Sequence, residues 1–175
     1  MKKILCILMS MAMLICMVSC GDDYSNKEPG LYRDGELVQT WDDLLESVGY
    51  TDFYASGVIT KGHFKECNGE LVLPDTTKEI DDYAFKNCEG LTSVVIPESV
   101  KEIGTSPFDR TCDNLTTIVI LNDDLEIPTE KEGNGKYDQR LVEKKGITIK
   151  ARKGSKAEEF ANEYAEQYGF KFESI

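Results

Sequence analysis

The sequence has few of the residues and motifs with which enzymes usually work. Its 175 residues include one histidine and one tryptophan. The chain has no nucleophile-elbow serine motif, no glycine-rich phosphate loop and no zinc-type spacing of cysteine and histidine. We therefore expect a protein that is not an enzyme and that needs no cofactor and no metal ion.

Positive charge is also scarce. The chain carries 20 Lys and Arg residues against 32 Asp and Glu residues, which gives a formal net charge of -12. Such a surface repels nucleic acids and anionic lipid headgroups, because both carry negative charge. Nucleic acid is therefore excluded as a partner, whereas cationic partners are compatible with the charge.

Only one long apolar run is present, over residues 4–18, and two lysines precede it. This layout is typical of a secretory signal peptide, here residues 1–19, and the run is short for a transmembrane helix. The run ends in Met17-Val18-Ser19-Cys20-Gly21, which resembles a bacterial lipobox with Met17 in place of the usual Leu. The resemblance implies that Cys20 is acylated, so that the exported chain is anchored by lipid alone. Gly21-Asp22-Asp23 resembles the surface-export signal of some lipoproteins, and we expect the chain in the outer membrane, at the cell surface. Exposure on the periplasmic side is the alternative that the sequence leaves open.

The chain has six cysteines, a number that would suit a disulfide-linked scaffold, but only three of them belong to the predicted fold. Two cysteines lie in the signal peptide and Cys20 is the expected lipid site, so Cys67, Cys88 and Cys112 remain. Each occupies the same repeat position, three or four residues after a phenylalanine, and free cysteine packs well in apolar surroundings. We expect a buried ladder of thiols. A disulfide between neighbouring rungs stays open, because an exported protein meets an oxidising compartment.

A repeat of 23 residues organises the middle of the chain. Leu71-Val72-Leu73-Pro74 returns as Val94-Val95-Ile96-Pro97, and Ile80 returns as Ile103. A fixed period of this length is typical of solenoids, in which each coil buries its apolar face against the next. We predict an α/β solenoid, a short leucine-rich repeat of about three coils over residues 56–121. The strand that begins at Ile118 does not complete a fourth coil in this interpretation.

The segments around the repeat have their own signals. Residues 20–30 are polar and predict a flexible tether. Residues 31–55 predict an N-terminal cap, with a hairpin turn at Asp34-Gly35 and a helix that Thr40 caps and Trp41 anchors. Residues 122–145 predict a loop excursion, in which calcium binding over residues 130–138 stays open. Residues 146–175 predict a C-terminal cap of strand, helix and strand, whose helix begins with the capping box Ser155 and Glu158.

The run from Ile80 to Gly104 resembles the BspA-like leucine-rich repeat. The end of the chain, from Lys153 to Phe160 and from Tyr168 to Phe170, is similar to the helix and strand that often close such proteins. The resemblance implies a repeat with a strand-lined face, secreted or surface-anchored, that binds host proteins, other cells or matrix. It supplies no catalytic residues.

The only histidine fits this repeat. His63 stands where later coils have Ala84 and Pro107, which favours a structural role. A dyad of His63 with Cys67, four residues on, is the catalytic alternative, but the sequence offers no third group to orient it.

The expected binding surface is the solvent side of the coil strands. Its candidate residues are Thr92, Ser93, Val95, Thr116, Thr117 and Val119. We predict a monomeric, non-catalytic lipoprotein that mediates protein-protein or cell-matrix binding, as an adhesin does. The alternative is a glycan-binding accessory lipoprotein of a polysaccharide-capture system. That role requires exposed aromatic side chains among Tyr24, Tyr32, Tyr50, Phe53 and Tyr54.

Overall fold

The computed structural model describes residues 24, 26–50, 52–61, 64, 67–131, 135 and 137–175. The predicted signal peptide, the predicted lipid site Cys20 and the histidine of the repeat, His63, lie outside the described residues. The roles assigned to them stay predictions.

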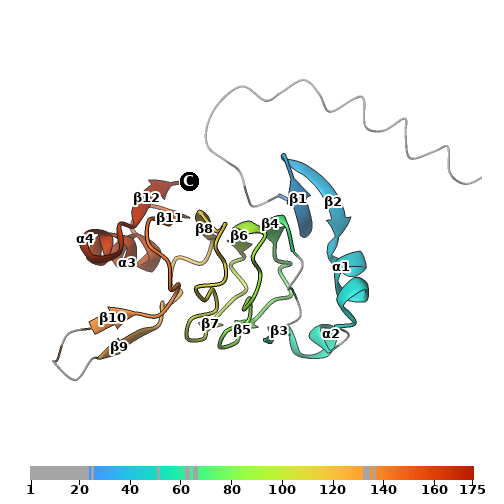
Figure 1. Cartoon of the computed structure of the whole chain (residues 1–175), viewed down its shortest axis with the longest axis horizontal. Helices are drawn as coiled ribbons and strands as arrows, with labels where there is room; N and C mark the ends of the chain where they lie inside the picture. The colour runs from blue at the N-terminus through green and yellow to red at the C-terminus, as the bar shows by residue number, and fades with distance from the viewer. Residues whose placement is uncertain are drawn as a thin grey trace, which may run out of the picture.

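Two sheets form the body of the protein, and the chain passes back and forth between them (Figure 1). The large sheet has the order β12-β11-β8-β6-β4-β1-β2, and the small one has the order β3-β5-β7. The large sheet comprises β1 (Gly30–Arg33), β2 (Glu36–Thr40), β4 (Gly69–Val72), β6 (Leu91–Ile96), β8 (Thr117–Ile120), β11 (Thr148–Ala151) and β12 (Lys171–Ser174). The small sheet comprises β3 (Val58–Ile59), β5 (Glu79–Ile80) and β7 (Glu102–Ile103).

The strand register reproduces the sequence repeat. Leu71 pairs with Val94 in the large sheet, and Ile80 pairs with Ile103 in the small sheet, both in parallel. Successive copies of the repeat therefore stack side by side with equivalent residues adjacent. This is the solenoid-like arrangement that the period predicts.

The main core lies between the two sheets and contains a stack of aromatic rings. The ring centroids of Phe64 and Phe85 are 5.8 Å apart, and those of Phe85 and Phe108 are 5.0 Å apart. Trp41 extends the stack, with its ring 5.5 Å from that of Phe64. Trp41 is 5% exposed, so the prediction that it anchors the core is confirmed.

The three cysteines of the repeat lie beside this stack, and all are buried with free thiols. The thiol of Cys88 donates a hydrogen bond to the carbonyl oxygen of Phe64 at 2.9 Å, and that of Cys112 donates to Phe85 at 3.2 Å. Each thiol thus ties its coil to the backbone of the preceding one. The ladder that the spacing predicts is present.

The hairpin and helix expected at the N-terminal end are formed. Asp34 and Gly35 adopt φ angles of 51° and 82°, as a tight hairpin turn requires. Helix α1 (Trp41–Val48) begins after Thr40, whose hydroxyl accepts the N–H of Asp43 at 3.3 Å, and a short helix α2 (Phe53–Ser56) follows. Strand β1 pairs antiparallel with β4, so the hairpin extends the large sheet.

The expected loop excursion over residues 122–145 is wrong in two respects. The segment contains a hairpin of β9 (Thr129–Lys131) and β10 (Tyr137–Gln139), and it places four apolar residues in the core. These are Leu125, Ile127, Leu141 and Val142. Because Ile118 pairs in parallel with Ile149, the fourth coil is completed, with the hairpin inserted into it. The polar hairpin separates the apolar positions and hides the period in the sequence.

The C-terminal segment follows the strand-helix-strand expectation. Helix α3 (Lys156–Glu163) begins at Ser155, whose hydroxyl accepts the N–H of Glu158 at 3.2 Å. The expected single helix is divided at Tyr164, and a short α4 (Ala165–Tyr168) precedes β12. Within the described part of the chain, no helix combines the length and the apolar character needed to cross a membrane.

Candidate binding surface

The large sheet has two apolar faces. Leu71, Val94 and Ile118 point into the main core, whereas the alternate residues point to the opposite side, because successive strand residues face opposite ways. We call that opposite side the outer face. Its buried residues form a second apolar cluster of Tyr32, Val72, Val95, Val119 and Leu121.

The predicted exposure of this face is wrong for its apolar residues. Val95 and Val119 are 1% and 0% exposed, and Ser93 is also buried. Thr92 and Thr116 are exposed, as predicted. The remaining candidate, Thr117, is half-buried.

The outer face is buried because other parts of the chain cover it. Three half-buried residues pack on the second cluster: Tyr24 before β1, Leu37 from β2 and Ile175 at the C-terminal end. The sequence gives no sign of these contacts, since the three residues are far apart along the chain.

We call Tyr24 and residues 26–29 the strap. Lys27 forms an ion pair with Glu70 of β4, and its ammonium lies 4.3 Å from the ring centroid of Tyr32. The hydroxyl of Tyr32 donates a hydrogen bond to the carbonyl oxygen of Glu28 at 2.8 Å. On the far side, Lys150 of β11 lies 6.0 Å from the ring centroid of Tyr24. The strap is thus packed on the sheet, and the expectation of a flexible tether is wrong for these residues.

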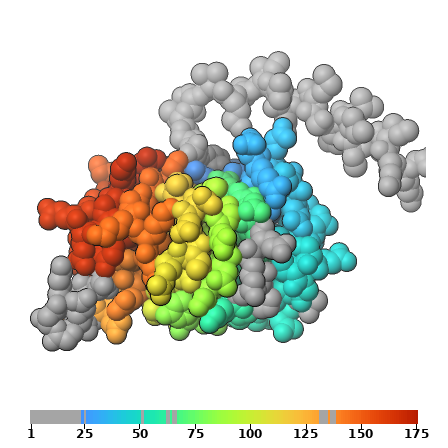
Figure 2. Space-filling model, in the orientation of Figure 1, coloured from blue at the N-terminus to red at the C-terminus, as the bar shows by residue number. Residues whose placement is uncertain are grey.

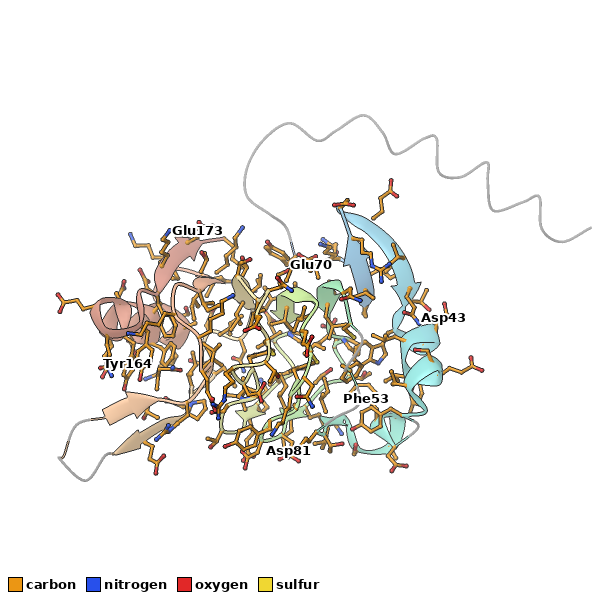
Figure 3. The ribbon with its side chains drawn as sticks, in the orientation of Figure 1. Asp43, Phe53, Glu70, Asp81, Tyr164 and Glu173 are labelled. Atoms are coloured by element: carbon orange, nitrogen blue, oxygen red, sulfur yellow. The ribbon has the colours of Figure 1, made fainter. Side chains whose placement is uncertain are left out.

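A groove of about 500 Å³ lies beside the strap, between the β1–β2 turn and the strands β4 and β6. It is lined by Lys27, Tyr32, Arg33, Asp34, Gly35, Asn68, Gly69, Glu70, Gly90, Thr92 and Ser93. In Figure 2 the blue hairpin rises beside the green strands of the first coils. Figure 3 places Glu70 on this side of the protein and Asp81 on the opposite side.

Both signs of charge meet in the groove. Lys27 and Arg33 supply cations, and Asp34 and Glu70 supply carboxylates. Ser93 donates its hydroxyl hydrogen to Glu70 at 2.9 Å, so that Glu70 is held from two sides. The groove is therefore polar and carries both signs of charge, with Lys27 and Glu70 paired to each other.

The groove includes two of the six predicted residues, Thr92 and Ser93, while Thr116 and Thr117 do not line it. A register shift between β4 and β6 pairs Gly69 with Leu91 and Glu70 with Ser93. Thr92 is the extra residue of β6 at this irregularity, which exposes it. Glu70 and Ser93 occupy equivalent positions of the repeat. This equivalence is the one sequence signal that could have predicted that they lie side by side.

The aromatic residues proposed for a glycan platform are mostly covered. Tyr32, Tyr50 and Phe53 are buried, and Tyr24 is half-buried on the second cluster. Tyr54 is 63% exposed, and its hydroxyl donates to Asp42 at 2.7 Å. Among these five residues, no exposed coplanar pair is available to stack on a sugar.

The described residues give no support to thiol or metal chemistry. Burial raises the pKa of Cys67 to about 12, so its thiol stays protonated at neutral pH and is a poor nucleophile. No group of three or more Cys, His, Asp or Glu side chains in this part of the chain is placed to hold a metal ion. Two of the residues considered for calcium, Glu132 and Asn134, lie outside the described residues, so that alternative is untested.

Residues 57–131 match the family model described as "BspA type Leucine rich repeat region (6 copies)". No curated protein and no solved structure matches the chain.

Proposed function

We propose that this chain is a lipid-anchored adhesin-like protein, because residues 57–131 match the BspA-type leucine-rich repeat model and such repeats generally mediate protein binding. In this proposal, residues 1–19 are removed, Cys20 carries the lipid and the domain lies at the cell surface. The domain is monomeric and non-catalytic, and it binds a surface protein of a host or of another bacterium.

The groove is the single observation that carries the proposal. It is a concave, charged site at the junction of the repeat and the hairpin, and it contains Thr92 and Ser93 from the expected binding strands. It is lined by 11 residues, fewer than the roughly 20–30 residues that each partner contributes to a standard interface. We expect one copy to bind weakly and many anchored copies to bind by avidity.

In the finer architecture that we infer, a solenoid of a few coils is closed at both ends. The hairpin and α1 cover the first coil, which is supported by the stacking of Trp41 on Phe64. Strand β11 and α3 cover the last coil, which is supported by the parallel pairing of β11 with β8. Caps of this kind keep a short repeat soluble and fix where its binding strands lie.

The test uses two matched lysine substitutions of exposed threonines. Thr92→Lys alters the groove, whereas Thr76→Lys lies in the exposed turn between β4 and β5. Wild type and both variants are displayed on beads at equal density. Their binding to purified matrix proteins and to intact cells is then measured.

We expect Thr92→Lys to lower binding at least tenfold and Thr76→Lys to leave it unchanged. Circular dichroism checks that both variants are folded. Equal binding by Thr92→Lys and wild type would exclude the groove, and failure of the wild-type beads to bind any target would count against the adhesin-like role. A glycan role is supported by no comparable observation.

A further inference from the structure

We propose that the outer face of the large sheet is a docking site for an extended polypeptide segment with an aromatic residue and a lysine, and that the strap occupies this site as a built-in ligand. The segment carries an aromatic residue and, three positions later, a lysine, as Tyr24 and Lys27 do. This inference rests on the proposed function and deepens it, because it states what kind of partner segment binds at the outer face.

The first half of the site is an apolar floor. Val72, Val95 and Val119 occupy equivalent positions in successive coils, and each is at most 3% exposed. In a sheet whose second face meets water, such positions are normally polar. A row of three valines therefore calls for an apolar partner, and the ring of Tyr24 packs on this cluster.

The second half is a receptor for an ammonium group. Glu70 supplies a carboxylate, Tyr32 supplies an aromatic face, and Lys27 contacts both. The hydroxyl of Ser93 bonds the other carboxylate oxygen of Glu70 at 2.9 Å and so orients it. A carboxylate and an aromatic face each attract an ammonium group, so the two together suit a lysine.

The contacts that hold the strap are of a kind that a partner segment can replace. They comprise an ion pair whose two side chains are 25% and 23% exposed, ring contacts, and one hydrogen bond from the Tyr32 hydroxyl to the Glu28 carbonyl. Both side chains of the pair still reach solvent, so a second lysine can approach Glu70 as Lys27 leaves. Each of these contacts can be made equally well by a second segment with the same two side chains.

The charge of the protein favours a lysine over an acidic residue at the position of Lys27 in such a segment. The chain has a formal net charge of -12, which attracts cationic partners and speeds their encounter. The strap competes with such a partner at the high effective concentration of an attached ligand, on the order of millimolar. A partner thus has to displace the strap before it can occupy the face.

The experiment measures binding of a synthetic peptide, Asp-Tyr-Ser-Asn-Lys-Glu-Pro, which copies residues 23–29, to the complete mature chain. Binding is followed by NMR through the valine methyl signals of Val95 and Val119. The loosened variant combines Tyr24→Ala with Lys27→Ala. Its matched control combines Tyr54→Ala with Lys61→Ala, which removes an exposed tyrosine and an exposed lysine away from the outer face.

We expect the loosened variant to bind the peptide at least tenfold more tightly than wild type, with shifts at both valines, and the control to behave as wild type. Adding Glu70→Gln, or changing the peptide lysine to glutamate, should weaken binding at least fivefold. Should the double variant be unstable, Lys27→Gln alone removes only the cation and still predicts tighter binding. Equal affinity for the loosened variant and wild type, or binding that leaves the valine signals unmoved, would overturn the proposal.

The outcome does not depend on the adhesin assay. Peptide binding without matrix or cell binding would leave the docking site standing and remove the adhesin-like role, and the reverse result would remove the docking site alone. Light scattering tests the remaining occupant, a second copy of the chain. A wild-type dimer that Lys27→Gln dissociates would place the strap on a neighbouring molecule and overturn its assignment as a built-in ligand.

Discussion

Raising the pH from 8 to 10 should destabilise the protein through its three buried thiols. Burial raises the pKa of Cys67 and that of Cys112 to about 12, from an ordinary value of 9.0. Burial also raises the pKa of Cys88, and the neighbouring Cys112, Cys67 and Asp109 add to the effect. At pH 10 the three thiols are therefore ionised in the unfolded chain and protonated in the folded one.

The sign and the size of the effect follow from this difference. The unfolded state loses protons that the folded state keeps, so the free energy of unfolding falls as the pH rises above 9.0. The stabilisation is complete below pH 9 and is lost progressively toward pH 12. One pH unit above the pKa of the unfolded chain, each thiol lowers the free energy of unfolding by about 1.4 kcal/mol. Three thiols cost about 4 kcal/mol, a large part of the stability of an ordinary domain.

Urea unfolding provides the assay, with the fluorescence of the buried Trp41 as the signal. The protein for this assay is residues 20–175 with Cys20→Ser, so that only the repeat thiols titrate. Because burial also raises the pKa of Tyr32, the informative quantity is the difference between this protein and Cys88→Ala. We expect Cys88→Ala to lose about 1.4 kcal/mol less stability between pH 8 and pH 10. If the two proteins lose the same stability between pH 8 and pH 10, to within about 0.3 kcal/mol, the reasoning is refuted.

Three further predictions concern the core, the outer face and the anchor. Phe85→Ala removes the ring between two stacked neighbours and should lower the free energy of unfolding by about 3–5 kcal/mol, while the exposed Val38→Ala should change it by less than about 0.5 kcal/mol; similar urea midpoints would contradict the stack. Val119→Lys buries an unpaired charge and should lower the melting temperature strongly, whereas the exposed Thr116→Lys should not; equal melting temperatures would mean that the outer face is uncovered. Protease treatment of intact cells should remove the wild-type protein, and Cys20→Ser should release the domain from the membrane fraction; protection from protease would place it in the periplasm.

The repeat could be predicted because each of its signals is local and recurs. The strands that contain Leu71 and Val94, and the pairing between them, follow from one period of apolar residues. The caps at Thr40 and Ser155 could be predicted for the same reason, since a capping residue and its partner lie three positions apart.

The candidate site could be predicted only in part. Thr92 and Ser93 were found from their place in the repeat, but the groove also requires Lys27 and Arg33, which reach it through the pairing of β1 with β4. The fourth coil was missed because a polar hairpin is inserted between apolar residues that would otherwise have shown the period.

The sequence by itself determined the repeat, its register and the aromatic and thiol ladders, because identical short-range patterns that stack side by side leave one way to bury their apolar face. It also determined the charge of the protein, which depends on composition alone. Only the tertiary structure decided which face of the strands meets water. Val95 and Val119 alternate with the core residues whether or not anything covers them, and their cover comes from Tyr24, Leu37 and Ile175. No local pattern records a contact between such distant segments, because it forms only when the hairpin, the repeat and the end of the chain fold together.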